Sequence, residues 1–147
     1  MLDVTPQKTV TFELDGREVT VSEGTTIWEA AQAEGQLIPH LCHKPEPGYR
    51  SDGNCRACMV EIEGERVLAA SCIRTVENGM VVHSQSERAA KSRALVVELL
   101  AADQPERAHD ASSHFSAMAE LNKVEHSRFP AKAVSYTHLT LPTKVTV

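Results

Sequence analysis

The sequence predicts an α+β fold of the β-grasp class, in which a mixed sheet of short strands wraps over one helix, followed by a C-terminal helical segment. Two observations lead to this prediction. Runs of alternating apolar and polar residues, separated by turn residues, indicate short strands in the first half of the chain. One short helical pattern interrupts these runs, and a longer one begins near residue 86.

The first predicted element is a β-hairpin. After a polar leader, residues 1–8, the segments 9–14 (TVTFEL) and 17–21 (REVTV) alternate between apolar and polar residues. Asp15 and Gly16 lie between them and form a common hairpin-turn pair. We therefore expect two antiparallel strands joined by a tight turn.

A predicted helix follows the hairpin and ends before Gly35. Either Thr25 or Thr26 can cap its N-terminus, because a threonine hydroxyl can accept a hydrogen bond from a free N–H group of the first turn. Glu34 is its last expected residue, and a glycine is typical of the position just after a helix. The residues expected on one face are Ile27, Ala30 and Ala31.

Three more short strands are predicted between residues 59 and 83. Residues 59–62 and 67–70 alternate around the turn at 63–65 and form a second hairpin. The turn pair Asn78-Gly79 then leads into a strand over residues 80–83.

From residue 86 onward the apolar repeat becomes helical. We expect a helix over residues 86–102. Its expected apolar face consists of Ala90, Ala94, Leu95, Val97 and Leu99. A second, short helix is indicated by the helical spacing of Phe115, Met118, Leu121 and Val124. We expect this helix to pack against a neighbour that is mostly missing from this sequence.

All four cysteines of the chain lie between positions 42 and 72, with the spacing Cys42-x12-Cys55-x2-Cys58-x13-Cys72. A binuclear iron–sulfur cluster needs four converging thiolates, and this set leaves no cysteine over. The close pair Cys55 and Cys58 can hold one iron from a single tight loop, so that Cys42 and Cys72 supply the remaining ligands. The four residues are therefore candidate ligands of one [2Fe-2S] cluster.

Three other uses of the cysteines are weaker. A zinc ribbon usually has two close C-x-x-C turns, whereas this chain has one. A disulfide framework is typical of a short, cysteine-dense secreted domain, and neither a signal peptide nor a high cysteine content is present. A redox-active dithiol at Cys55 and Cys58 would usually precede a helix, but the residues that follow (MVEIEGERV) alternate like a strand.

Two histidines, His40 and His43, flank Cys42 and raise the question of mixed ligation. A Rieske-type site needs two histidines on one iron. No histidine lies near Cys55, Cys58 or Cys72 in the sequence. We therefore expect both histidines to be loop residues and not ligands.

Charge and hydropathy exclude two classes of partner. The formal net charge is -5 and the sequence pI is about 5.8, which argues against nucleic-acid binding. No apolar run approaches the roughly 20 residues that a membrane-spanning helix needs. Because no targeting segment is apparent, we expect the thiols to stay reduced in a cytoplasmic setting.

Residues 9–82 resemble the [2Fe-2S] ferredoxin domain that opens the electron-input subunits of complex I, NAD-reducing hydrogenases and NAD-dependent formate dehydrogenases. The phrases IPHLCH, GNCRACMVEIEG and AASC carry this resemblance. Within the family, the stretch from HKPEPGYRSDGN to AASC looks most like the α subunit of molybdenum- or tungsten-dependent formate dehydrogenase. The resemblance implies a ferredoxin-like β-grasp domain that holds the cluster on the four cysteines.

One segment departs from part of the family. In complex I and many relatives, the helix after this domain leads into a motif of one histidine and three cysteines that binds a tetranuclear cluster. Here the corresponding stretch reads LLAADQPERAHDASSHF and holds no cysteine. We therefore expect His109 and His114 to be solvent-facing tail residues, and the absence favours the formate dehydrogenase branch over complex I.

The resemblance implies electron transfer and no catalysis by this chain itself. In the parent oxidoreductase, formate would be oxidised at a molybdopterin site, and electrons would pass through iron–sulfur centres to a flavin subunit that reduces NAD. The expected partners are that flavin/NAD-binding subunit and downstream domains of the same chain. An alternative is the input subunit of complex I or of an NAD-reducing hydrogenase. An alternative of another class is a zinc-stapled structural module.

Arg56 lies between two expected ligands. Its positive charge could raise the reduction potential of the cluster, because it favours the reduced and more negative form. An equally good interpretation is a surface charge on an exposed loop. The sequence does not decide between the two.

The sequence divides into three expected segments. Residues 1–84 form the [2Fe-2S] ferredoxin-like domain, and residues 85–132 form a helical linker to missing downstream domains. Residues 133–147 (AVSYTHLTLPTKVTV) contain a string that back-translates to a transposase-type sequencing adapter. We expect this tail to be an artefact and not a natural strand, and the natural protein to continue beyond about Lys132.

Overall fold

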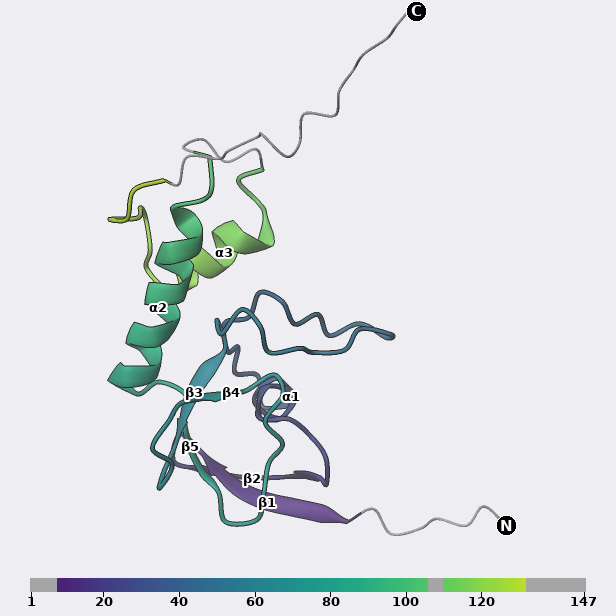
Figure 1. Cartoon of the computed structure of the whole chain (residues 1–147). Coiled ribbons are helices and arrows are strands. Elements are labelled where there is room, and N and C mark those ends of the chain that lie inside the picture. Colours follow the sequence, from purple (N-terminus) through teal and green to yellow (C-terminus); the bar gives the residue numbers. More distant parts are fainter. Residues whose placement is uncertain (1–7, 106–109, 132–147) are drawn as a thin grey trace, which may run out of the picture.

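The computed structural model of the chain describes residues 8–105 and 110–131. Five short strands form one sheet, and three helices accompany it (Figure 1). The elements in order are β1 (Thr9–Leu14), β2 (Arg17–Ser22), α1 (Ile27–Ala33), β3 (Met59–Ile62), β4 (Ala69–Ala70), β5 (Val81–His83), α2 (Glu87–Ala101) and α3 (His114–Leu121).

The sheet is mixed, with the strand order β2-β1-β5-β3-β4. β1 pairs antiparallel with β2 and parallel with β5, whereas β3 is antiparallel to both β5 and β4. The parallel pair places the first strand of the chain beside the last, with Glu13 opposite Val81. This topology confirms the predicted β-grasp fold.

The core lies between this sheet and α1. Trp28 is 1% exposed, and its indole Nε1 donates a hydrogen bond to the Ile38 carbonyl oxygen at 3.0 Å. Thr26 caps the helix as predicted, because its hydroxyl accepts from the Glu29 N–H group while the Glu29 carboxylate accepts from the Thr26 N–H group. Gly35 follows the helix with φ +75°. The largest fully buried apolar side chains are Trp28, Phe12, Ile27, Ile38, Val60, Val82 and Val97.

Two strands are shorter than predicted. The expected strand over residues 67–70 is reduced to β4, because Val67 is 63% exposed and only Ala69 and Ala70 pair with β3. The expected strand over 80–83 begins one residue later. Met80 still belongs to the preceding turn, where its N–H group donates to the Glu77 carbonyl oxygen.

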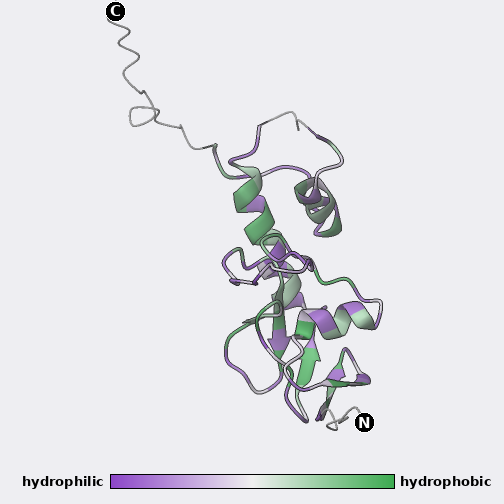
Figure 2. Cartoon of the chain, turned by 90° about the vertical axis from the view of Figure 1, so that its right-hand side faces the viewer, coloured by the Kyte–Doolittle hydropathy of each residue, from purple (hydrophilic) through white to green (hydrophobic). Residues whose placement is uncertain are grey.

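The bounds of α2 agree with the prediction, but of its predicted apolar face only Val97 is buried. The residues that are buried are Ala89, Arg93 and Val97, spaced by four, whereas Ala90, Leu95 and Leu99 are exposed. At the other positions the prediction failed because the charged residue Arg93 was not expected to be buried. Figure 2 shows hydrophobic residues along the half of α2 that is farther from the sheet.

Helix α3 packs back onto the chain, against the segment just before Cys42. His114 Nε2 lies 2.7 Å from the His40 carbonyl oxygen, and the Met118 sulfur accepts a hydrogen bond from the His40 N–H group at 3.4 Å. Met118 is 5% exposed, while Leu121 is 46% exposed. The helix therefore has a neighbour within this chain. His114 is exposed, as expected of a solvent-facing residue, but it also contacts the backbone of His40.

Some predictions fall on segments that the structure does not describe. His109, the adapter-like tail 133–147 and all but the last residue of the leader 1–8 lie outside the described residues. Within residues 8–105 and 110–131, no helix is long and apolar enough to span a bilayer.

The hairpin turn is tied to distant segments by the Asp15 carboxylate. It accepts hydrogen bonds from the backbone N–H and the hydroxyl of Ser84, and from the side-chain amide of Gln36. Burial raises the pKa of Asp15, but the hydrogen bonds from Ser84 and Gln36 outweigh it and lower the pKa below 3.8.

We predict that Asp15→Asn lowers the free energy of unfolding at pH 7 by about 1 to 3 kcal/mol, because three hydrogen bonds lose their charged acceptor. The contribution is complete above pH 3.8 and is lost as the pH falls through the lowered pKa of the folded state. Urea denaturation measures the loss in the free energy of unfolding. The control is Glu18→Gln, at an exposed position of β2, which should change this free energy by less than about 0.5 kcal/mol. Equal effects of the two variants would contradict the role of Asp15.

Candidate metal centre

The four cysteines lie at one edge of the fold, on segments without regular secondary structure. Cys42 and Cys55 belong to the long connection between α1 and β3, which projects from the body of the domain in Figure 1. Cys58 immediately precedes β3, and Cys72 follows β4. Cys42 is exposed and Cys55 half-buried, whereas Cys58 and Cys72 are 1% and 2% exposed.

The structure brings all four thiols together in two pairs. The Cys42 N–H group donates to the Cys55 sulfur at 3.4 Å, and the two side chains are within hydrogen-bonding reach of each other. The side chains of Cys58 and Cys72 are likewise hydrogen-bonded, and Cys72 is close enough to the other three to feel their charge. Cys55 and Cys58, which the sequence suggested could hold one iron together, therefore lie in different thiol pairs of the structure.

The pKa values of the thiols follow from this pairing. The hydrogen bond from the Cys72 thiol lowers the pKa of Cys58, and burial only partly opposes it. The same hydrogen bond and the charge of the Cys58 thiolate raise the pKa of Cys72. Burial raises the pKa of Cys55. Thiolates in such close pairs repel one another, and a bound cation would relieve this repulsion.

Backbone N–H groups are directed at the Cys55 sulfur. The Ala57 N–H group donates to it at 3.4 Å, in addition to that of Cys42. Arg56 adopts a left-handed backbone conformation (φ +59°), which turns the chain tightly enough for this contact. Such N–H groups stabilise negative charge on sulfur, and they are one of the means by which proteins tune iron–sulfur centres.

Two pairs of thiols match the donor set of a binuclear cluster, in which each iron takes two protein ligands. The four thiols supply this number of donors, and they therefore fit a [2Fe-2S] cluster. Within the part of the chain that the structure describes, no three His, Cys, Asp or Glu side chains are arranged around a position for a single metal ion.

His40 and His43 are loop residues, as predicted, but both are buried. They are 9% and 8% exposed, and their rings pack edge-on against the Trp28 indole, with centroid distances of 4.7 and 4.4 Å. His43 Nδ1 also contacts the Ser51 hydroxyl. They attach the cysteine-bearing loop to α1, a role that sequence spacing could not show.

Arg93 is a residue near the site that sequence reasoning missed. It extends from α2, is 3% exposed, and donates hydrogen bonds to the carbonyl oxygens of Met59 and Ser84 at 2.7 and 2.8 Å. Met59 directly follows Cys58 in the chain. By contrast, Arg56, which we considered as a tuning charge, is exposed. The signal that could have pointed to Arg93 is its four-residue spacing from Ala89 and Val97.

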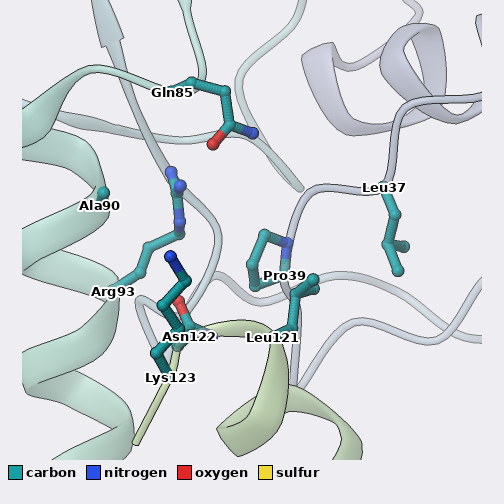
Figure 3. Close-up of a pocket in the computed structure, with 8 residues that line it drawn as sticks. All are labelled: Leu37, Pro39, Gln85, Ala90, Arg93, Leu121, Asn122 and Lys123. Carbon is teal, nitrogen blue, oxygen red and sulfur yellow. The ribbon is translucent and has the colours of Figure 1, made fainter.

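A cavity of about 240 Å³ lies beside Arg93, between α2, the segment before Cys42 and the C-terminus of α3. Figure 3 shows the Arg93 side chain reaching from α2 toward Gln85, with Lys123 on the other side. The lining residues are Leu37, Pro39, Gln85, Ala90, Arg93, Leu121, Asn122 and Lys123.

Gly53 allows the cysteine-bearing loop to pass close to Ile73, next to Cys72. Its φ is +64°, and a β-carbon at this position would lie 2.7 Å from Ile73 Cδ1. Gly48, in the same loop, has φ +87° but open space around it. Both glycines therefore have a backbone conformation that other residues rarely adopt, but only Gly53 has a side chain packed against it.

We predict that Gly53→Ala lowers both the free energy of unfolding and the cluster content per chain more than Gly48→Ala does. Both lose about 1 to 2 kcal/mol to the left-handed conformation, and Gly53→Ala adds about 0.5 to 1.5 kcal/mol for displacing the Ile73 side chain, which is 44% exposed. Urea denaturation and visible absorbance per chain measure the two effects. Adding Ile73→Val to Gly53→Ala should recover part of the loss. Equal losses in the two single variants would show that the close approach to Ile73 is unimportant.

Known proteins that resemble this chain share its cysteine-bearing domain. The model of a family described as "2Fe-2S iron-sulfur cluster binding domain" matches residues 7–87. An NADH-quinone oxidoreductase subunit from Rickettsia typhi is 40% identical over 92 residues, which cover 63% of this chain and 13% of that protein. The corresponding subunit from Streptomyces coelicolor is 42% identical over 106 residues, covering 69% and 12%.

Hydrogenase subunits are similar to the same part of the chain. The NADP-reducing hydrogenase subunit HndD of Solidesulfovibrio fructosivorans is 39% identical over 99 residues, covering 65% of this chain and 17% of that protein. A crystal structure of an NAD+-reducing [NiFe]-hydrogenase in the H2-reduced state superposes with a TM-score of 0.75 at 32% identity, covering 86% of this chain and 54% of that one. The chain spans less than a fifth of the length of the three curated relatives named above.

Proposed function

We propose that this chain, which belongs to the family of 2Fe-2S iron–sulfur cluster binding domains, relays single electrons within a larger NAD(P)-linked redox complex. The cofactor is a [2Fe-2S] cluster, and the domain is an electron-transfer domain. The convergence of all four cysteines at one edge of the fold is the observation that carries the proposal.

Cys42, Cys55, Cys58 and Cys72 are the proposed ligands. The two thiol pairs seen in the structure support one iron on Cys42 and Cys55 and the other on Cys58 and Cys72. When bound, the cluster supplies a site that accepts and returns one electron without making or breaking bonds to a substrate. The four cysteines would hold it, and the N–H groups of Cys42 and Ala57 would donate to the Cys55 sulfur.

The complex to which the chain contributes is proposed from its relatives. The similar proteins are subunits of NADH-quinone oxidoreductase and of hydrogenases, so they support the complex I or hydrogenase alternative better than the formate dehydrogenase that the sequence suggested. Membership of such a complex implies a flavin- or NAD-binding partner subunit. The domain proposed to bind the cluster is residues 1–84, and residues 85–132 connect it to the rest of the assembly.

We predict that chains reconstituted without oxygen contain two irons and two sulfides each, because four thiolates hold one binuclear cluster. Iron and sulfide analysis measures the content, and the protein should be red-brown and bleach with dithionite. One zinc per chain, with no iron uptake, would support the structural zinc module instead.

We predict that Cys58→Ala abolishes the visible spectrum and lowers thermal stability, because metal binding is part of the folding free energy in small metal-binding domains. Val60→Ala is a matched control on the same segment, since Val60 is fully buried but is no ligand. It should lower the unfolding temperature while the folded chains keep full cluster absorbance. A Cys58→Ala protein with an unchanged spectrum would exclude Cys58 as a ligand.

A further inference from the structure

We infer that Arg93 is a positioning residue for the cluster loop, and that its buried positive charge raises the reduction potential of the cluster. The inference rests on the proposed function, because it concerns a cluster held by Cys58 and its partners. It extends that function by assigning the control of the potential to a residue of α2, outside the cysteine-bearing segments.

The first reason is the burial of an arginine that has no carboxylate partner. Arg93 is 3% exposed, and within residues 8–105 and 110–131 no Asp or Glu forms an ion pair with it. Its Nε–H group is buried without a hydrogen-bond partner. A buried and unpaired charge is costly, and an apolar residue of similar size would usually be cheaper. A nearby negative charge would offset this cost.

The second reason is the position of the guanidinium relative to Cys58. It donates to the carbonyl oxygen of Met59, the residue after Cys58, and it interacts electrostatically with the Cys58 thiolate. Its other acceptor, the Ser84 carbonyl oxygen, holds it against the end of β5. These two carbonyl oxygens thus hold the Arg93 guanidinium beside the start of β3, which directly follows Cys58.

The third reason is that Arg93 keeps its positive charge. Asp15 and then Cys58 attract the guanidinium, and the Asp15 carboxylate, which is hydrogen-bonded to Ser84 and Gln36, forms no ion pair with it among the described residues. Burial lowers the pKa of Arg93, and the charges of Asp15 and Cys58 partly restore it, so the side chain remains a cation. Because a cluster with four thiolate ligands becomes more negative on reduction, a fixed cation in a low-dielectric region favours the reduced form.

The test compares the one-electron reduction potential of four cluster-loaded proteins, the wild type and three variants, by redox titration followed by visible absorbance. Arg93→Gln removes the charge and keeps a polar side chain with N–H donors, although a shorter one. Arg93→Lys keeps the charge. Lys91→Met removes an exposed charge from the same helix and is the control.

We expect Arg93→Gln to lower the ratio of reduced to oxidised cluster about tenfold at a fixed solution potential, which is a shift of about 59 mV for one electron. Arg93→Lys should remain within about threefold of the wild type, and Lys91→Met should behave like the wild type. Iron content and unfolding temperature, measured on the same samples, separate loss of the fold from a change in potential.

Three outcomes would overturn the inference. The first is a loaded Arg93→Gln protein with the wild-type potential, and the second is one with a higher potential, as greater solvent access to the cluster would produce. The third is an equal shift in Arg93→Gln and Arg93→Lys, which indicates a role in packing alone. A wild-type chain that takes up no cluster would instead contradict the proposed function on which the inference rests.

Discussion

Four thiols that repel one another when ionised must be held together by stretches of chain that are far apart in the sequence. The hydrogen bonds of α1 provide much of this restraint. Its first turn leaves N–H groups without helical partners, and two of them donate to the carbonyl oxygens of Ser71 and Arg74, which flank Cys72. The Ser71 hydroxyl and N–H group in turn donate to the Cys58 carbonyl oxygen. The helix end thereby fixes one buried pair of thiols.

The opposite side of the site depends on Trp28. The Trp28 ring is buried in the core, and its N–H group donates a hydrogen bond to the Ile38 carbonyl oxygen. The rings of His40 and His43 pack edge-on against the Trp28 ring. Because these two histidines flank Cys42, packing on the helix also determines where the first ligand lies. The exposed Cys42 is therefore positioned by buried neighbours and not by regular secondary structure.

The spacing of apolar and polar residues was sufficient to predict where strands and helices lie, but not which side chains of the site contact one another. Alternation in β1 and β2 and the Thr26 cap of α1 depend on local sequence, so they could be predicted. Which thiols lie together depends on how separate loops meet, and the spacing of Cys55 and Cys58 did not indicate that each lies beside a distant cysteine. On the buried face of α2 only Val97 was predicted. Arg93 was missed because it is charged, and its burial depends on backbone carbonyl oxygens contributed by other elements.

The packing of α3 has a consequence for the order of events during synthesis. His114 and Met118 contact the backbone of His40, more than seventy positions earlier in the chain. The cysteines have therefore all left the ribosome well before the helix that covers the start of their loop. This delay leaves a period in which the start of the loop is held by its contacts with α1 and not yet by α3.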